Sequence, residues 1–373
     1  MKKLKLVTII GTRPEIIKLS ETIKKADKFF DHILVHTGQN YAYTLNEIFF
    51  EDLGLRKPDY YLDVVGANLG ETIGNIISKS YNLLQIIKPD AMLILGDTNS
   101  ALSAISAKRL KIPIFHMEAG NRCFDENLPE ELNRRIVDHI SDVNLPYTEH
   151  ARRYLYAEGI KKEYVYVTGS PMVEVIRNNK ERIKNSTICD DLGLTRKEYI
   201  ILSAHREENL DIAKNFKNLI NSINFMAETF KVPIIYSLHP RSKKLIEEQN
   251  INFHHLVSKL EPFSFSDFIS LQLNSKCVVS DSGTLAEESS FLGFPAVSIR
   301  TSTERPEAID NGNFIIGSIF AESLVQSVHM AITMGAETKS NSKLAYTDCN
   351  VSNVVIKIIQ SYVDIVNKKI WLK

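Results

Sequence analysis

The residues best suited to chemistry stand between positions 115 and 135. Carboxylates and guanidinium groups are crowded within this stretch, namely Glu118, Asp125, Glu126, Glu130, Glu131, Arg122, Arg134 and Arg135. They follow a short apolar run, residues 112–115, that is typical of a buried parallel strand. Ligands bind beyond the carboxyl ends of the strands in open parallel sheets, so we expect a polar site here. The alternative is a solvated loop before a helix that opens at Pro129 and favours acid at its N-terminus.

A glycine turn at residues 11–15, Gly-Thr-Arg-Pro-Glu, follows the first apolar run, residues 4–10. A strand that ends in such a turn and opens a helix presents backbone N–H groups and the helix dipole to an anion. Arg13 adds a bidentate phosphate donor. The turn is neither G-x-G-x-x-G nor G-x-x-x-x-G-K-[ST], which disfavours a nicotinamide cofactor and a P-loop. The alternative is a tight turn with an incidental arginine.

Asp97 stands at the end of another apolar run, residues 91–95. It therefore brings a second carboxylate to the carboxyl edge of the expected sheet. The alternative is a helix N-cap, and both roles can hold together.

The second half of the chain repeats this pattern. Asp281 precedes Ser282-Gly283-Thr284 at an expected helix N-terminus, which suits a phosphate group. One turn later, Glu287 and Glu288 suit the two hydroxyls of a ribose. Two histidines follow strands directly and have arginine neighbours, His205 with Arg206 and His239 with Arg241. No G-x-S-x-G or H-E-x-x-H motif occurs, so the residues together indicate a nucleoside diphosphate held between two Rossmann-like halves, without a metal.

The composition restricts the class of protein. A chain of 373 residues is too long for one ordinary core, and its 45 basic and 45 acidic residues give no field for nucleic acid or an anionic membrane. The four cysteines are widely spaced, which fits a reducing compartment. The apolar start is too short for a signal peptide, and no run is long enough to span a bilayer. We therefore expect a cytoplasmic α/β protein.

Alternating strand and helix patterns divide into two sets. The first set includes strands at 32–36 and 91–95 and a long helix at 69–87; the second has strands at 198–202, 233–237, 277–280 and 295–299. The polar stretch 177–191 lies between them, so we expect domains of residues 1–172 and 173–351. Two doubly wound domains that face each other across a cleft would place every polar motif at a strand's carboxyl edge.

Taken together, the motifs resemble those of the non-hydrolysing UDP-N-acetylglucosamine 2-epimerases. The matching segments, in order, are Gly-Thr-Arg-Pro-Glu, Gly-Asp-Thr, His-Met-Glu-Ala-Gly-Asn-Arg, Pro-Glu-Glu-x-Asn-Arg, His-Arg-Glu-Glu-Asn, Asp-Ser-Gly-x-x-x-Glu-Glu and Thr-Glu-Arg-Pro-Glu. The resemblance covers nearly the whole chain. It implies the glycosyltransferase-B (GT-B) fold, a UDP-sugar substrate, no cofactor, a homodimer, and a final helix at 352–373 that packs on the first domain.

The resemblance also implies roles for individual residues. Acid/base work on both faces of the sugar C2 would fall to Asp97, Glu118 and Glu130, because UDP leaves as C2 loses its proton and later re-adds. His205, Arg13 and the Ser282-Gly283 helix terminus would stabilise the leaving UDP. Glu288 would hold the ribose. Further substrate or UDP contacts are expected at Lys18, Arg122, Arg206, His239 and Arg305.

Two segments depart from members that act on UDP-N-acetylglucosamine (UDP-GlcNAc). Those members have Gly-Leu-Arg-Thr where this chain has Gly-Asn-Arg-Cys-Phe-Asp at 120–125, and an allosteric Gln-His-Arg-x-Met-Leu segment where this chain has residues 39–46. Both replacements resemble the branch that forms UDP-N-acetyl-L-fucosamine for capsule or O-antigen. A sister branch, acting on UDP-2,3-diacetamido-glucuronate, shares them. The alternatives of another class are a GT-B glycosyltransferase and a non-catalytic UDP-sugar sensor.

Overall fold

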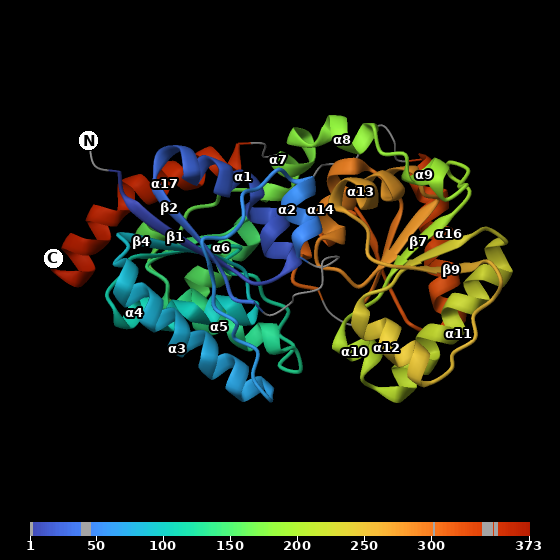
Figure 1. The fold of residues 1–373 in the computed structure, drawn as a ribbon. Coiled ribbons are helices and arrows are strands. Elements are labelled where there is room, and N and C mark those ends of the chain that lie inside the picture. Colours follow the sequence, from blue (N-terminus) through green and yellow to red (C-terminus); the bar gives the residue numbers. More distant parts are fainter. Residues whose placement is uncertain (1–2, 39–45, 301–302, 338–345, 347–349) are drawn as a thin grey trace. The chain divides into compact units, whose positions relative to one another are not determined.

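The computed structural model describes residues 3–38, 46–300, 303–337, 346 and 350–373. By its internal contacts the chain forms two compact units, of which the first comprises Met1–Asn178 with Asp348–Lys373 and the second Asn179–Thr347 (Figure 1). The segment 39–46, on which one substrate expectation rests, lies outside the described residues except for Asn46.

The first unit is built on a six-stranded parallel sheet in the order β3-β2-β1-β4-β5-β6. Its strands are β1 Lys5–Ile10, β2 Asp31–His36, β3 Tyr60–Tyr61, β4 Ala91–Leu95, β5 Ile114–Met117 and β6 Val143–Leu145. The strands β1, β4 and β5 are almost wholly apolar and buried, as expected for a parallel sheet covered on both faces.

Helices cover this sheet on both faces (Figure 1). They are α1 Arg13–Phe29, α2 Glu47–Asp52, α3 Leu69–Ile87, α4 Ala104–Arg109, α5 Pro129–Ile140, α6 Glu149–Ala157, α7 Pro171–Asn178 and α17 Val351–Val366, with short turns at η2 Asn99–Ser103, η3 Lys162–Tyr164 and η4 Asn367–Trp371. Helix α3 has the bounds that its periodicity predicts, because Asn68 caps it by accepting from the Glu71 N–H at 2.9 Å. Helix α17 packs on α1, and Ser352 N–H donates to Glu174 of α7 at 2.8 Å.

The second unit has a six-stranded parallel sheet in the order β12-β11-β10-β7-β8-β9. Its strands are β7 Ile200–Ser203, β8 Ile234–Ser237, β9 Val257–Leu260, β10 Cys277–Ser280, β11 Ala296–Ile299 and β12 Ile315–Gly317. Its helices are α8 Lys180–Lys184, α9 Ile188–Asp191, α10 Glu207–Leu210, α11 Ala213–Phe230, α12 Pro240–Glu248, α13 Phe265–Asn274, α14 Leu285–Leu292, α15 Pro306–Asp310 and α16 Ala321–Glu337. One apolar cluster joins the sheet to α11 and α16, and another joins it to α13 and α14.

Both sheets have the same doubly wound order, so the prediction of two Rossmann-like α/β halves is confirmed. In each half the strand order reverses once, between β1 and β4 in the first unit and between β7 and β10 in the second. Crevices for ligands form at the carboxyl ends of the strands beside such a reversal. The reversal points therefore indicate where to look for a site in each unit.

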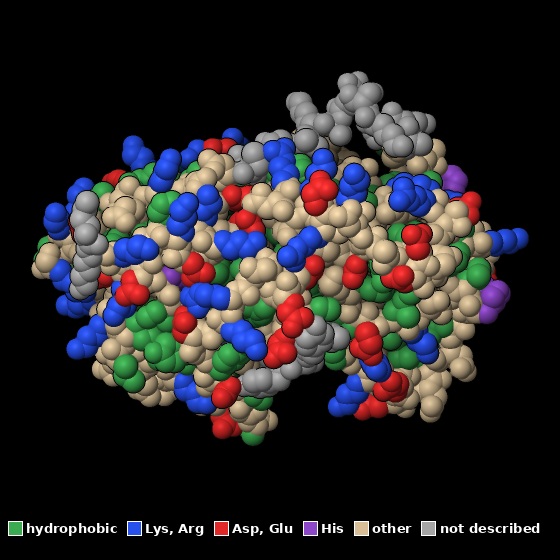
Figure 2. Space-filling view, turned by 45° about the horizontal axis from the view of Figure 1, so that its top comes forward, with side chains coloured by type: hydrophobic (Ala, Val, Ile, Leu, Met, Phe, Trp, Pro, Cys, Tyr) green, Lys and Arg blue, Asp and Glu red, His purple; other side chains and the backbone are tan. Residues whose placement is uncertain are grey.

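The described surface fits the balanced composition. Figure 2 shows basic and acidic side chains interspersed on the face in view. Among the residues that the structure describes, no helix combines the length and the apolar character needed to cross a bilayer.

Candidate active site

Glu118 directly follows β5, the strand that pairs with β4 on the far side of the reversal point of the first sheet. Its backbone has a φ of +65°, in the left-handed region that costs a non-glycine residue energy, so the surrounding contacts must hold it there. Its Oε2 accepts from Lys18 Nζ at 2.7 Å and from the Tyr147 hydroxyl at 3.2 Å, and its Oε1 accepts from Asn121 Nδ2 at 3.3 Å. A carboxylate that is held by several donors and still 10% exposed can reach a ligand.

The loop after β4 brings Asp97 next to Glu118. The Gly96 N–H donates to the Met117 carbonyl at 2.9 Å, and a Cβ atom placed on Gly96 would lie 4.0 Å from the Glu118 carboxylate carbon, so the two acidic loops are adjacent. Asp97 Oδ2 accepts from Arg134 of α5, at 3.0 Å from Nε and 2.6 Å from Nη2. The N-cap of the following turn is Thr98, so Asp97 is not the cap.

Helix α5 supplies the third carboxylate. Pro129 occupies its first turn, as the sequence predicts, and Glu130 follows at a half-buried position. Its neighbour Glu131 is buried instead and accepts from Arg134 Nη1 at 2.8 Å. Burial alone would raise the pKa of Glu131, but hydrogen bonds from Cys123 and the Arg134 charge lower it overall. Arg134 therefore ties Glu131 to Asp97 and fixes the start of α5 against the β4 loop.

Arg122 lies in a buried ion-pair network rather than at an open edge. Its Nη1 donates to Asp138 at 2.7 Å, and its Nη2 donates to Glu158 at 2.6 Å, with no exposed side-chain area. Burial disfavours the charge of Asp138, yet His116 and Arg122 keep its pKa below the usual range. The structure thus places Arg122 behind the acidic loops, in contrast to the substrate contact that the resemblance implies.

Asp138 and His116 connect the loops that carry the acidic residues. Asp138 accepts from Gly120 N–H at 3.1 Å and lies 3.0 Å from His116 Nδ1, and the other ring nitrogen of His116 lies 2.8 Å from the Gly96 carbonyl oxygen. Sequence reasoning missed both residues. The only signal was a histidine within an apolar strand, which is ambiguous because such histidines are often structural.

The glycine turn before α1 differs from its expected form. The N–H groups of Gly11 and Thr12 donate to the carboxylate of Glu15, at 3.0 and 2.8 Å, in a capping box. These two donors are therefore directed at a side chain of the same helix rather than at a ligand. Burial raises the pKa of Glu15. Arg13 is half-buried, with its guanidinium carbon 5.9 Å from the centre of the Phe49 ring.

In the second unit the reversal between β7 and β10 brings His205 beside Asp281. The fully buried carboxylate of Asp281 accepts from the N–H groups of His205 and Arg206, each at 2.9 Å, and lies 3.1 Å from His205 Nδ1. Burial raises the pKa of Asp281, but the His205 charge and these donors hold it well below its usual range. The imidazole of His205 is 27% exposed and stacks on His239, 5.6 Å between ring centres. Asp281 thus orients His205 with one ring nitrogen engaged.

Gly283 lies where the loops after β10 and β11 meet. A Cβ atom at this position would lie 2.9 Å from Glu304 Oε1 and 3.9 Å from Arg206 Nη2, so only glycine fits without displacing a neighbour. The Ser282 hydroxyl lies 3.0 Å from the Thr284 hydroxyl at the start of α14. The structure therefore brings the predicted Arg206, Ser282 and Gly283 together with His205 at one edge of this sheet.

The two glutamates of α14 are buried and differ in their partners. Glu287 forms an ion pair with Arg305 at 2.8 Å, and both side chains are 1% exposed or less. Glu288 accepts from Gln272 Nε2 of α13 at 2.7 Å. Arg305 and Glu288 therefore lie along the α14 side of the sheet, within the same unit as His205.

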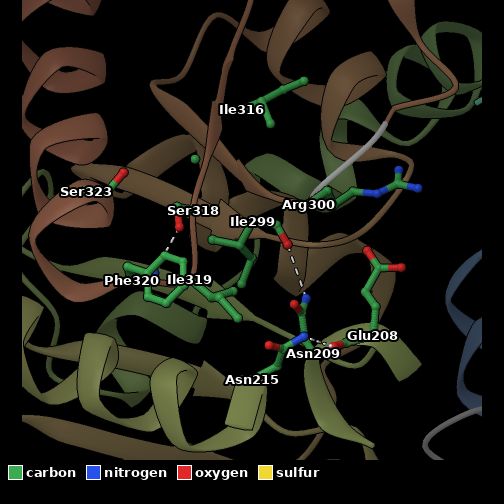
Figure 3. Close-up of a pocket in the computed structure, with 11 residues that line it drawn as sticks. Glu208, Asn209, Asn215, Ile299, Arg300, Ile316, Ser318, Ile319, Phe320 and Ser323 are labelled. Atoms are coloured by element: carbon green, nitrogen blue, oxygen red, sulfur yellow. Dashed lines mark hydrogen bonds between the residues drawn. The ribbon is translucent and has the colours of Figure 1, made fainter. Parts of the chain in front are cut away.

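A cavity of about 380 Å³ opens at the carboxyl edge of β11 and β12 (Figure 3). Isoleucine and phenylalanine side chains contribute apolar surface to its lining, and Asn209 and Asn215 contribute side-chain amides (Figure 3). Asn209 Nδ2 donates both to the Ile299 carbonyl and to Asp281 Oδ2, each at 3.1 Å. This amide therefore links the cavity wall to the carboxylate that orients His205.

Comparison with known proteins agrees with this arrangement. The family model described as UDP-N-acetylglucosamine 2-epimerase matches residues 22–360. The structure of a UDP-N-acetylglucosamine 2-epimerase from Rickettsia bellii is 47% identical, with a TM-score of 0.90 and full coverage of both chains. That of the Methanocaldococcus jannaschii UDP-GlcNAc 2-epimerase, in complex with UDP-GlcNAc and UDP, is 34% identical with a TM-score of 0.90, and covers 96% of this chain and 100% of that one.

A relative with another substrate in its name also matches. The UDP-2,3-diacetamido-2,3-dideoxy-D-glucuronate 2-epimerase of Pseudomonas aeruginosa is 31% identical over 88% of this chain and 92% of its own. The family model and the relatives therefore agree on one reaction class and one GT-B-like fold. This chain belongs to the UDP-N-acetylglucosamine 2-epimerase family.

Proposed function

We propose that this UDP-sugar 2-epimerase converts UDP-2-acetamido-2,6-dideoxy-L-talose into UDP-N-acetyl-L-fucosamine, for capsular polysaccharide or O-antigen. The observation that carries the proposal is the contact of Asn121 Nδ2 with Glu118 Oε1 at 3.3 Å. The family members that act on UDP-GlcNAc have leucine at the position of Asn121. A leucine side chain cannot donate a hydrogen bond. The segment 120–125 therefore alters the surroundings of an acid/base residue itself, which supports a different sugar.

The proposed reaction is an elimination followed by a re-addition. A carboxylate takes the C2 proton, the C2–H electron pair forms a C1–C2 double bond, and the C1–O pair leaves with UDP. The resulting 2-acetamido-glycal then takes UDP back at C1 while an acid delivers a proton to the opposite face of C2. Atoms and charges balance without a redox cofactor, and both faces of C2 need an acid/base group.

We assign the C2 chemistry to Asp97, Glu118 and Glu130. The contact between the Gly96 and Glu118 loops and the Arg134 link from α5 to Asp97 support this, because they hold acids from three elements at one sheet edge. Lys18 and Arg122 support these acids without themselves exchanging the proton. Lys18 forms an ion pair with Glu118, and Arg122 forms one with Asp138.

We assign the UDP group to Arg13 and to the second unit. Cations and a helix N-terminus stabilise the negative charge that develops as UDP leaves. His205, Arg206 and Ser282-Gly283 provide these groups at one edge of the second sheet, beside His239. Glu288 accepts from the ribose hydroxyls, and Arg305 supports α14 through Glu287. We also propose a cytoplasmic homodimer, whose mass in solution analytical ultracentrifugation would measure.

Proton NMR in D₂O tests which UDP-sugar is the substrate. The purified enzyme is offered UDP-2-acetamido-2,6-dideoxy-L-talose, UDP-GlcNAc and UDP-2,3-diacetamido-glucuronate in separate tubes. We expect deuterium at C2 with the first sugar. Exchange only with UDP-GlcNAc would show that the chain is a UDP-GlcNAc 2-epimerase. Exchange only with the uronate would assign it to the sister branch. Exchange with none of them would refute the epimerase assignment, since a transferase or a sensor leaves C2 untouched.

Two variants test the catalytic assignment. Asp97→Asn and Glu118→Gln each remove a proton-transfer group while keeping the shape of the side chain, so we expect loss of turnover with UDP binding retained by calorimetry. Glu126→Gln is a matched control, because Glu126 is 85% exposed in the same segment and should leave turnover unchanged. Most of the activity persisting in both active-site variants would remove the assignment.

The kinetics test the second departure from the parent activity. Residues 39–46 replace the segment tied to activation by UDP-GlcNAc in members that use that sugar. We therefore propose hyperbolic rates that do not respond to added UDP-GlcNAc. Sigmoidal rates relieved by UDP-GlcNAc would contradict this interpretation.

A further inference from the structure

Tyr147 contacts both members of the buried ion pair beside the acidic loops. Its hydroxyl donates to Glu118 Oε2 at 3.2 Å, and Lys18 Nζ lies 5.7 Å from the centre of its ring. Lys18 Nζ in turn donates to the same Oε2 at 2.7 Å. The three side chains come from α1, the end of β5 and the end of β6, so Tyr147 joins elements that are far apart in sequence.

The backbone holds Tyr147 firmly on both sides. Pro146 O accepts from Thr168 N–H at 2.9 Å, and the Thr148 side chain caps α6 by accepting from Ala151 N–H at 3.3 Å. Tyr147 as a whole is only 2% exposed. Its hydroxyl is therefore delivered to Glu118 from a fixed position.

Glu118 needs such support because its backbone is strained. A carboxylate on a residue with a φ of +65° is aimed by its contacts and not by a preferred local geometry. Two donors on one oxygen fix the rotation of the carboxylate plane. Proton transfer depends steeply on this orientation, because the reacting atoms must be aligned as well as close.

We propose that Tyr147 is a positioning residue for the epimerisation, and that its hydroxyl holds the Glu118 carboxylate in the orientation that exchanges the C2 proton. The inference rests on the proposed role of Glu118 and adds a residue that the motifs do not include. Tyr147 itself does not contact the sugar in this proposal. Its effect should therefore appear in the proton-transfer step and not in substrate binding.

The test compares Tyr147→Phe with the wild type on the UDP-sugar that exchanges at C2. Phenylalanine keeps the packing and the ring face toward Lys18, so only the hydroxyl is removed. We expect kcat to fall about 10-fold or more, as for a lost hydrogen bond to a charged group, with KM within about two-fold. A deuterium isotope effect from C2-labelled substrate should increase, because proton transfer then limits the rate. Tyr156→Phe, at a 41% exposed tyrosine of α6, is the control.

The outcomes separate this inference from the proposed function. The inference alone would be overturned if Tyr147→Phe kept the wild-type kcat. It would also be overturned if KM changed by the same factor as kcat and the isotope effect stayed unchanged. A wild-type enzyme without C2 exchange on any of the three sugars would overturn both. Thermal melting checks that Tyr147→Phe is folded. If it is not folded, Tyr147→Met, which also lacks the hydroxyl, takes its place in the test.

Discussion

Gly120 allows a sharp test of how the acidic loops are held. It has a φ of +80°, and an added Cβ atom would clash with the Ala151 carbonyl oxygen and lie 2.8 Å from Leu155 Cγ. Its N–H also donates to Asp138 at 3.1 Å. Gly159 has nearly the same backbone, with a φ of +85°, but no atom of the residues that the structure describes lies within 4 Å of its added Cβ. The pair separates backbone strain from steric overlap.

The magnitudes follow from these two contributions. An alanine in the left-handed region costs about 1–2 kcal/mol, which we expect for Gly159→Ala. Gly120→Ala adds overpacking against a helix backbone, typically about 1–3 kcal/mol, because a carbonyl oxygen cannot rotate away like a side chain. We therefore expect Gly120→Ala to lower the free energy of unfolding by about 2–5 kcal/mol, and clearly more than Gly159→Ala.

Urea unfolding, monitored by tryptophan fluorescence, measures this difference in the structural unit that contains both glycines. The chain has one tryptophan, Trp371, and it belongs to the first unit along with both glycines. Turnover provides a second readout, since movement of Gly120 would displace Glu118 and Asn121 on either side and lower kcat. Equal losses of stability in the two variants would refute the steric argument, and a stable but inactive Gly159→Ala would refute the functional one.

Two further predictions concern groups whose pKa differs between the folded and unfolded chain. Burial lowers the pKa of His36 to about 4, so between pH 6.5 and 4 the unfolded chain binds the extra proton and stability falls as the pH falls. By pH 4 this amounts to about 3 kcal/mol, which His36→Asn should abolish in urea titrations while the exposed His329→Asn should not. Asp281→Asn should lower the free energy of unfolding by about 2–4 kcal/mol at pH 7, because it weakens several buried hydrogen bonds to a charge. The native pKa of Asp281 is depressed, so its stabilisation is lost as pH falls below about 4, and a gap to the wild type that widened in acid would contradict this account.

Much of the fold follows from local patterns in the sequence. The bounds of α3 are recovered because its apolar spacing and the Asn68 cap agree, and β10 is recovered as a continuous apolar run between polar loops. The short stretch 164–168 is different, since only an isolated bridge joins Val165 to Asn144. Its tyrosines and valines favour extended backbone, but pairing depends on neighbours that a local pattern does not include.

The polar neighbours of the site are harder to predict. The sequence places Asp97 and Glu118 at strand ends, yet it gives no reason to connect either to Arg134 or Tyr147. The contact of Tyr147 with Glu118 spans 29 residues, and that of Lys18 with Glu118 spans 100. Such contacts depend on which strands are adjacent, and the order of strands in a sheet has no local signature. Arg122 is a further example, because its motif gives no sign that its side chain is fully buried between Asp138 and Glu158.

The surroundings of the acidic residues distinguish carboxylates that hold the structure in place from carboxylates suited to proton transfer. The sequence alone does not distinguish these two roles. Asp138 and Asp281 are fully buried, accept several hydrogen bonds and have lowered pKa values, so they remain charged and hold donors in place. A group in that state is a poor acid or base near neutral pH, because it does not readily take up a proton. Asp97 and Glu118 have fixed partners as well but are 21% and 10% exposed at the carboxyl ends of β4 and β5. This difference supports our proposal that the partly exposed carboxylates exchange protons with a bound sugar, while the buried ones set the geometry in which that exchange occurs.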